Sequence, residues 1–347
     1  MKKLYTEQEW KNHSLKKAYK ALKNKIRKRR KDKKKHYLSK TIVGKLENVR
    51  LRKDANGIEA PSTFSLIDNI DETLNFFQSI YTVSNKFPHK RIQFDFSGIK
   101  NLTTDAILYL LSRMDYLHLQ RYFHGGFSGN EPVDKESFQL FQASGFYKYV
   151  RTLRADKIQN NPNIYTIESG KLVMASKAKE VKDFIKHCLG KEESSNTKEI
   201  YTSIIECMAN TRHHAYGAEN RYSKWWFMAS FDKDRVHFTF LDNGFGIPTT
   251  INKKFKEKVR DILGKLLPLE DTDAKLILSA LKGDFRTKTK EGYRGKGLPR
   301  IYDTVKNKKI ENLVIVSRKG FVNVSAGTQI TLKENFYGTL LSWDIIK

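Results

Sequence analysis

Asp242, Gly244 and Gly246 form an Asp-x-Gly-x-Gly pattern directly after residues 236–241, in which apolar and polar side chains alternate. The alternation predicts a β-strand, and the Asp242 carboxylate then stands at the strand end, where side chains can face a ligand. Glycines after it permit positive φ angles and the close approach of a flat ligand. Taken alone, the pattern is also typical of an ordinary turn after a strand.

A second group of polar residues, Glu206, Asn210 and His213, lies in residues 200–216, whose apolar side chains recur at steps of four and predict a helix. The spacing of the three is i, i+4 and i+7, so they share one stripe. An amide oxygen is a hard ligand for a divalent metal, and a carboxylate can accept a proton from water. Neither His213 nor His214 has a Cys or His partner at metal-binding spacing; we expect His213 to line a pocket and His214 to be structural.

A third stretch, residues 292–299, reads Gly-Tyr-Arg-Gly-Lys-Gly-Leu-Pro and opens a predicted helix that runs to about residue 305. Pro299 suits a first helical turn. Free N–H groups at a helix start bind anions, and Arg294 and Lys296 add positive charge. The stretch therefore predicts a phosphate site.

In this order, the three motifs resemble those of the GHKL superfamily: gyrase, the heat-shock-ninety chaperones, histidine kinases and MutL. The likeness covers residues 155–347 and implies a Bergerat-type α/β sandwich that binds ATP with Mg²⁺. By position, it implies that Asn210 binds magnesium, Asp242 binds the adenine amino group and, where the family hydrolyses ATP, Glu206 activates water. The other implied nucleotide-binding residues are Gly244, Gly246, Arg294, Gly295, Lys296, Gly297, Leu298 and Thr339. One departure is Gly292, three residues before Gly295, where the family usually has Gly-x-Gly-x-Gly.

The rest of this region is expected to frame those motifs. We predict a helix over residues 178–189 and a hairpin of two strands, residues 225–231 and 236–241. Residues 251–282 should be mostly helical, where the resembled superfamily has a mobile lid. A further hairpin should turn at Lys319–Gly320, and the last strand should cover residues 338–345. The segment 285–291, with Arg286, Lys288 and Lys290, is either a solvated loop or a part of the lid that senses phosphate.

Residues 62–154 resemble the STAS domain of anti-sigma-factor antagonists in one feature, a strand at residues 91–96 followed by a helix that begins near Thr103-Thr104-Asp105. We also predict helices over residues 65–82 and 136–143 and a short strand near residues 122–124. Those antagonists can be phosphorylated on a Ser or Thr that follows an Asp. Here the acid follows the hydroxyls, so Thr103 and Thr104 are expected to be helix caps.

Charge is concentrated in the first part of the chain. The formal net charge of the 347 residues is +27, and residues 1–53, with 21 Lys and Arg against 4 Asp and Glu, supply +17 of it. Ten basic residues lie between Lys23 and Lys35. This block predicts a basic helical arm that binds nucleic acid rather than a membrane, because no apolar face accompanies it.

Two cysteines and the lack of a long apolar run favour a cytoplasmic, bacterial protein without a disulfide framework, and Cys207 is expected to be a small core residue. The predicted fold class is α+β, with an arm (1–53), a STAS-like domain (54–154) and a GHKL ATP-binding domain (155–347). The first hypothesis is a magnesium-dependent ATPase that acts as a conformational switch, reads nucleic acid through residues 23–35, and meets another protein or a second copy through the STAS-like domain. The alternatives are a serine/threonine protein kinase of the anti-sigma-factor type and a non-catalytic nucleotide-binding scaffold.

Overall fold

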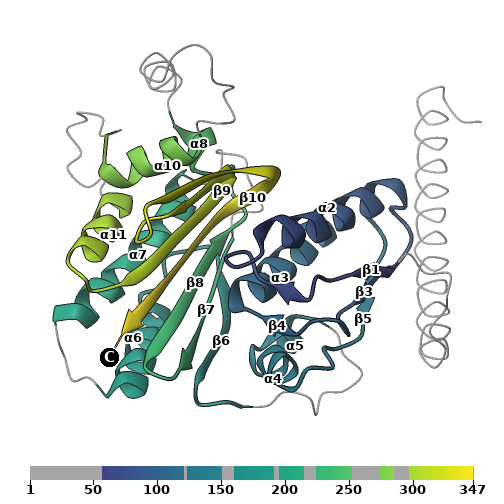
Figure 1. Ribbon diagram of the computed structural model, residues 1–347, viewed down its shortest axis with the longest axis horizontal. Helices are drawn as coiled ribbons and strands as arrows, with labels where there is room; N and C mark the ends of the chain where they lie inside the picture. The colour runs from purple at the N-terminus through teal and green to yellow at the C-terminus, as the bar shows by residue number, and fades with distance from the viewer. Residues whose placement is uncertain are drawn as a thin grey trace, which may run out of the picture. The chain divides into compact units, whose positions relative to one another are not determined.

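The computed structural model describes residues 57–120, 123–150, 160–190, 195–214, 224–251, 273–284 and 297–346. The chain divides into two compact units, residues 1–55 and 56–347, and every described residue belongs to the second. That unit mixes helices with parallel and antiparallel sheets, in agreement with the predicted α+β class (Figure 1). The predicted basic arm lies outside the described residues.

The first half of this unit contains short parallel strands and longer helices. A three-stranded parallel sheet has the order β1-β3-β5, and β2 pairs with β4. The elements of this half are β1 (Gly57–Glu59), β2 (Thr63–Phe64), α2 (Ile70–Lys86), β3 (Ile92–Asp95), β4 (Asn101–Leu102), α3 (Thr104–Leu119), β5 (Phe127–Gly129), α4 (Lys135–Ala143) and α5 (Phe146–Tyr149). The predicted short strand near residues 122–124 corresponds to β5, which begins a few residues later, after Gly125 and Gly126.

The second half is built on a five-stranded antiparallel sheet with the order β6-β7-β8-β10-β9. The sequence patterns predicted the hairpin of β7 and β8 and both helices that precede it. The elements of this half are β6 (Ile164–Gly170), α6 (Ala175–Leu189), α7 (Ser195–His214), β7 (Trp225–Asp232), β8 (Arg235–Asp242), α8 (Ile247–Thr250), α10 (Asp273–Lys282), α11 (Gly297–Lys306), β9 (Glu311–Asn323) and β10 (Thr328–Ile346). Of the predicted helical segment 251–282, residues 252–272 lie outside the described residues.

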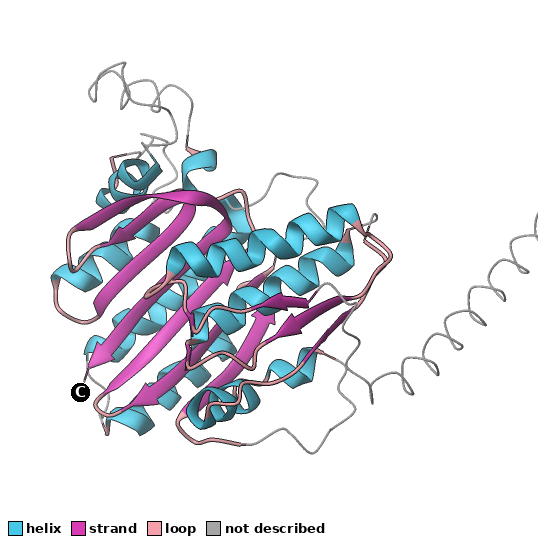
Figure 2. Ribbon diagram, turned by 45° about the vertical axis from the view of Figure 1, so that its right-hand side comes forward, coloured by secondary structure: helices cyan, strands magenta, loops and turns pink. Residues whose placement is uncertain are grey.

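Helices cover both faces of the five-stranded sheet (Figures 1 and 2). On β7, Trp225 and Phe227 pack into the core formed with α6, α7, α10 and α11, whereas Trp226 and Met228 pack into the core formed with α2 and α3. Both tryptophans are fully buried. This explains why β7 reads as a continuous apolar run, as strands covered on both faces do.

One hydrophobic core crosses the boundary predicted near residue 154. Phe77 and Tyr109, from α2 and α3, belong to the same buried cluster as Leu241 and Phe336 of the sheet. The Tyr109 ring stacks on Phe336 with 4.4 Å between ring centroids. Residues 57–150 therefore pack on the sheet and supply one of its two helical layers, α2 and α3. The predicted domain boundaries stay predictions.

The predicted hairpin at Lys319–Gly320 is wrong, because β9 runs straight through these residues and Gly320 pairs with Thr331 of β10. A Cβ at Gly320 would lie 2.7 Å from the Ala274 nitrogen. The glycine thus lets α10 approach the strand, and it does not mark a turn. The chain reverses after Asn323 instead, and β10 begins at Thr328.

Candidate functional site

Helix α7 presents Glu206 and Asn210 next to each other because they are four residues apart. Its apolar stripe, which includes Ile204 and Met208, is buried against the sheet. Glu206 and Asn210 are half-buried on an adjoining stripe. The side chains of His213 and His214 lie outside the described residues.

The start of α11 meets this stripe at Gly297. A Cβ built on Gly297 would lie 2.9 Å from Asn210 Nδ2, 3.0 Å from Asn210 Oδ1 and 3.0 Å from Glu206 Oε2. Any other residue would force these polar groups aside, because real Cβ contacts are longer. Two motifs that are almost ninety residues apart in sequence therefore converge at one point. We call Glu206, Asn210 and Gly297 the motif cluster.

Arg300, which the motifs did not single out, completes the surroundings of the motif cluster. Its Nη1 lies 2.5 Å from Glu206 Oε1 in an ion pair, and the Arg300 side chain is half exposed. Arg300 is three residues after Gly297 on α11, so the helix brings it to the same face. The carboxylate of Glu206 is thereby held by a cation in the described structure.

Asp242 ends β8 as predicted and is 6% exposed. Its Oδ1 accepts a hydrogen bond of 2.7 Å from the Gly244 N–H. Burial raises the pKa of Asp242 from its ordinary 3.8 to about 7, against the opposing effects of hydrogen bonds from the Gly244 and Thr339 backbones and of the Arg113 charge. A buried carboxylate with this pKa gains from any additional donor that approaches it.

Asp242 also lies near α7, on the side of the sheet that carries the motif cluster. Burial raises the pKa of the Cys207 thiol, and the negative charges of Asp242 and Glu206 raise it further. Cys207 is 2% exposed, which confirms the expectation of a core residue. Both acidic groups therefore lie close enough to the Cys207 thiol to act on it electrostatically.

Two glycines shape the loop after Asp242. Gly246 has a φ of +84°, and Gly338, beside the loop on β10, has a φ of +109°. A Cβ on Gly338 would lie 1.9 Å from the Asp242 carbonyl oxygen. The positive φ that the sequence predicted is confirmed at Gly246. Gly338 lets two strands approach closely.

Ser317 of β9 ties this loop to the sheet, and no sequence motif pointed to this residue. Its Oγ accepts from the Ile247 N–H at 2.9 Å and donates to the Gly338 carbonyl at 3.0 Å. Thr339 Oγ1 lies 3.3 Å from Ser317 Oγ, and Thr339 pairs with Asp242 across the two strands. Thr339 is therefore near Asp242, as its position in the last strand predicted.

Several predicted site residues are not among those that meet at the motif cluster or at Asp242. Arg294, Gly295 and Lys296 lie outside the described residues, as does the run with Arg286, Lys288 and Lys290. Leu298 is described, and it packs, partly buried, against the core under α11.

Helix α3 begins at Thr104, as predicted, but the threonine hydroxyls have other partners than expected. Thr103 occupies the cap position, but its hydroxyl makes no cap hydrogen bond and lies 3.3 Å from the Phe64 carbonyl oxygen. Thr104 is 7% exposed, and its hydroxyl lies 2.9 Å from that of Thr239 on β8. The expected capping role of both threonines is wrong, because packing on the sheet and on β2 competes for their hydroxyls.

The carboxylate of Asp105, the second residue of α3, bonds this helix start to a neighbouring segment. Its Oδ2 accepts from the Leu66 N–H, and burial raises its pKa from 3.8 to about 6. Hydrogen bonds from Thr103 and from the Leu66 backbone oppose that rise. Asp105 thus joins α3 to the segment after β2 and takes part in no cluster of site residues.

Among the described residues, no three His, Cys, Asp or Glu side chains come together as a metal site, and no helix is long and apolar enough to cross a membrane. No protein-family model matches the chain, and no curated protein matches it either.

Proposed function

We propose that this chain is a magnesium-dependent ATP-binding protein of GHKL type that hydrolyses ATP and uses it as a conformational switch. The observation that carries the proposal is the convergence at Gly297, whose Cα leaves room for no side chain beside Asn210 and Glu206. Asp242, a buried carboxylate at a strand end, lies on the same side of the sheet. These are the three groups that the resemblance requires, in the order in which it requires them.

The residues present fit such a ligand. Asp242 keeps unused acceptor capacity beside its bonds from the Gly244 and Thr339 backbones, and an adenine amino group is a suitable donor. The Asn210 amide oxygen is a hard ligand, and nucleotide-bound magnesium takes most of its remaining ligands from phosphates and water. When bound, the magnesium ion neutralises phosphate charge. Asn210 and Glu206 would therefore face the phosphates, with Asp242 on the base.

Hydrolysis would use Glu206 as the general base. The carboxylate takes a proton from a water molecule while the water oxygen forms a bond to the γ-phosphorus. The bond from that phosphorus to the bridging oxygen breaks, and ADP leaves with the electron pair. This role requires Glu206 to exchange its bond with Arg300 for one with water.

The ion pair between Arg300 and Glu206 favours a second function, a nucleotide-binding scaffold without turnover. A carboxylate that is paired with a guanidinium must break that pair before it can take a proton from water. The scaffold would bind ATP through Asp242 and Asn210 alone. A protein kinase of the anti-sigma-factor type remains the third possibility, and it differs only in where the phosphate goes.

The experiment is to incubate the full chain with γ-labelled ATP and magnesium and to follow the label. Free phosphate supports the ATPase, label on protein supports the kinase, and bound ATP without turnover supports the scaffold. Glu206→Gln should keep ATP binding and lower turnover by about 10²–10⁴-fold. Glu199→Gln, on the same helix about two turns earlier, is the matched control and should turn over ATP normally. Equal turnover by Glu206→Gln and the control would reject Glu206 as the base.

The remaining proposals concern partners. Residues 23–35 would bind nucleic acid through its phosphates, and the STAS-like region would meet another protein or a second copy. Each phosphate contact on duplex DNA should contribute about −0.9 to the slope of log affinity against log salt. Deleting residues 1–36 should flatten this slope and leave ATP binding intact. An unchanged slope in salt titrations of the truncated chain would remove the arm from the proposal.

A further inference from the structure

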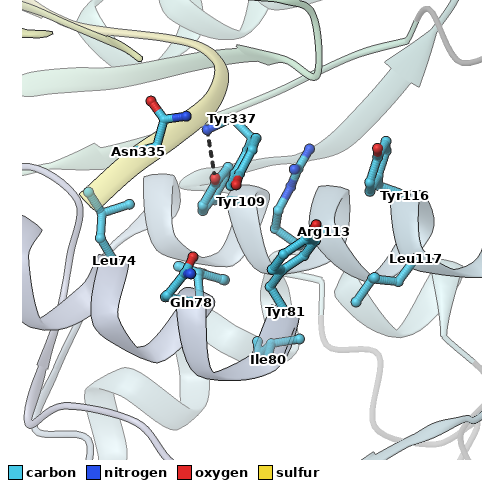
Figure 3. Close-up of a pocket in the computed structure, with 11 residues that line it drawn as sticks. Leu74, Gln78, Ile80, Tyr81, Tyr109, Arg113, Tyr116, Leu117, Asn335 and Tyr337 are labelled. Atoms are coloured by element: carbon cyan, nitrogen blue, oxygen red, sulfur yellow. Dashed lines mark hydrogen bonds between the residues drawn. The ribbon is translucent and has the colours of Figure 1, made fainter. Parts of the chain in front are cut away.

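We propose that the cavity between α2, α3 and β10 binds a small aromatic carboxylate, and that this ligand weakens nucleotide binding at Asp242. The effect on the nucleotide rests on the proposed function, whereas the binding site does not. The cavity measures about 90 Å³ and is shown in Figure 3. Its lining residues are Leu74, Phe77, Gln78, Ile80, Tyr81, Tyr109, Arg113, Tyr116, Leu117, Asn335 and Tyr337.

Size and lining favour a single aromatic ring. The volume is several times the roughly 30 Å³ share of one water molecule and approaches the roughly 150 Å³ of cavities that accept benzene. Tyr81 and Tyr337 lie on opposite elements with 6.1 Å between ring centroids, and both are well exposed. Leu74, Ile80 and neighbouring side chains supply an apolar wall. Offset or edge-on contacts with tyrosine rings add to the burial of an aromatic ligand.

Charge favours an anion. Arg113 is the cation of the cavity, and the lining contains no acidic residue. Within the described part of the chain, no carboxylate lies within 4 Å of its guanidinium. Its charge instead faces the rings of Tyr109, Tyr116 and Tyr337, with 5.2, 4.9 and 5.8 Å to the centroids. A carboxylate would give Arg113 the ion pair that it does not have among the described residues.

Two buried polar atoms at the cavity have no hydrogen-bond partner among the described residues. They are Arg113 Nε, a donor, and Asn335 Oδ1, an acceptor. Buried polar groups are costly when unpaired. An aromatic carboxylate that also carries a hydroxyl group offers an acceptor and a donor, the two kinds of partner that these atoms need.

Arg113 connects the cavity to the loop at Asp242. Its Nη2 donates to Asn243 Oδ1, and Asn243 Nδ2 donates to the Ser112 carbonyl at 3.2 Å. Asn243 directly follows Asp242 in the chain. Burial raises the pKa of Asp242, and the positive charge of Arg113 opposes that rise and so favours the ionised form. The cavity and the motif loop therefore share one side chain.

The sign of the coupling follows from this shared arginine. A carboxylate bound to Arg113 cancels its charge at Asp242, and the ionised form of Asp242 becomes less favourable. An adenine amino group donates best to the ionised form, so the aromatic carboxylate should weaken ATP binding. By reciprocity, ATP should weaken the aromatic carboxylate by the same factor.

The experiment uses the full chain with 4-hydroxybenzoate as the probe, measured by calorimetry and ligand-observed NMR with and without ATP and magnesium. We expect saturable binding and at least a roughly fivefold rise in the probe's Kd when ATP is bound. Gln78→Trp should fill the cavity and abolish probe binding. Ser79→Trp adds the same bulk one residue later, at an exposed position of α2 outside the cavity lining, and should bind normally. Arg113→Met should lose both probe binding and the coupling.

The outcomes test the cavity site, its coupling to the nucleotide and the proposed function separately. Absence of saturable binding, or equal binding by Gln78→Trp and the unmodified chain, would overturn the site. If Gln78→Trp does not fold in thermal unfolding, retained binding by a folded Arg113→Met would overturn it instead. An unchanged probe Kd under conditions in which ATP binding is measured would overturn the coupling. Probe binding by a chain that binds no ATP would reject the proposed function and leave the cavity site standing.

Discussion

The starts of α3 and α11 lie on opposite faces of the same sheet, and they treat their polar groups in opposite ways. At α3, Thr104 and Asp105 are buried and bonded to Thr239 and Leu66, which belong to neighbouring elements. At α11, Gly297 lets the side chains of Asn210 and Glu206 come close to the helix start, and Glu206 stays half-buried there. Polar groups that hydrogen-bond to neighbouring elements hold a layer in place. Polar groups that lie beside a glycine at a helix start are available to a ligand.

The same contrast holds for the two buried carboxylates. Burial raises the pKa of both, Asp105 to about 6 and Asp242 to about 7. The hydrogen bond that Asp105 accepts from Leu66 joins α3 to the segment after β2. Asp242 stands at a strand end beside a loop that begins with glycines. We therefore expect substitution of the first to change stability and substitution of the second to change binding.

The largest effect is expected from Asp242→Asn, which should abolish ATP binding. The Asn amide group would present donors where adenine also presents a donor, and buried polar groups would stay unpaired. Calorimetric titration of ATP with magnesium measures the loss. The matched control is Asp105→Asn, which should bind ATP normally. ATP binding of full strength by a folded Asp242→Asn chain would remove Asp242 from the proposed site.

Proton release gives an independent test of Asp242. Because its pKa is about 7 and a bound amino group favours the ionised form, ATP binding near pH 6.5 should release a fraction of a proton. Calorimetry in two buffers with different ionisation enthalpies detects the release. Binding enthalpies that do not depend on the buffer would contradict it.

The next largest effect is expected from Gly297→Ala. A Cβ within 3.0 Å of Asn210 and Glu206 must displace them, so ATP binding should weaken by about tenfold or more, a free energy near 1.4 kcal/mol. Helix stability should not fall, because Ala is the better helix former. Gly126→Ala is the control, since its Cβ would meet only Arg91 Nε at 3.8 Å. Unweakened binding by Gly297→Ala would show that the motif cluster does not contact the nucleotide.

The fourth prediction concerns pH and the α3 start. The folded chain binds a proton at Asp105 with a pKa near 6, above the 3.8 of the unfolded chain. Stability from this group is therefore present below about pH 4 and is lost as the pH rises through about 6. Asp105→Asn should remove about 1.4 kcal/mol per pH unit from the slope of unfolding free energy in this window. Denaturant unfolding at pH 4, 5 and 6 measures it.

The control for that slope is Asp232→Asn at the exposed hairpin turn of β7 and β8. It should leave the pH dependence as it is in the unmodified chain. Identical slopes for Asp105→Asn and Asp232→Asn would mean that the buried carboxylate does not gain stability from protonation.

Local periodicity predicted what local geometry decides. The four-residue spacing of Glu206 and Asn210 placed both on one face of α7, and the alternation before Asp242 placed the acid at a strand end. The approach of Gly297 to α7 followed only from the resemblance, because no local signal links the two segments. Arg113 and Ser317 reach the loop after Asp242 from distant parts of the chain, and no spacing in the sequence connects them to it.

The errors have the same physical origin. Lys319–Gly320 has the composition of a turn, yet Gly320 serves the close approach of α10 to a continuous strand. Thr103 and Thr104 precede a helix as caps do, yet tertiary partners take their hydroxyls. Turn and cap preferences describe isolated segments, and packing against another layer overrides them.

The smallest effect on ATP binding is expected from Thr104→Val, at the joint between α3 and β8. The change removes one of two buried hydroxyls that lie 2.9 Å apart and leaves Thr239 without its partner. The free energy of unfolding should fall by about 1–3 kcal/mol, whereas Thr104→Val combined with Thr239→Val should cost less than the two single changes together, because both partners are then apolar. Denaturant unfolding of the four chains of this cycle gives the interaction energy. ATP affinity should be the same in all four, since the joint only holds the helical layer. Additive costs would show that the two hydroxyls do not interact. A change in ATP affinity would show that the α3 start has a role beyond packing and would end its contrast with the α11 start.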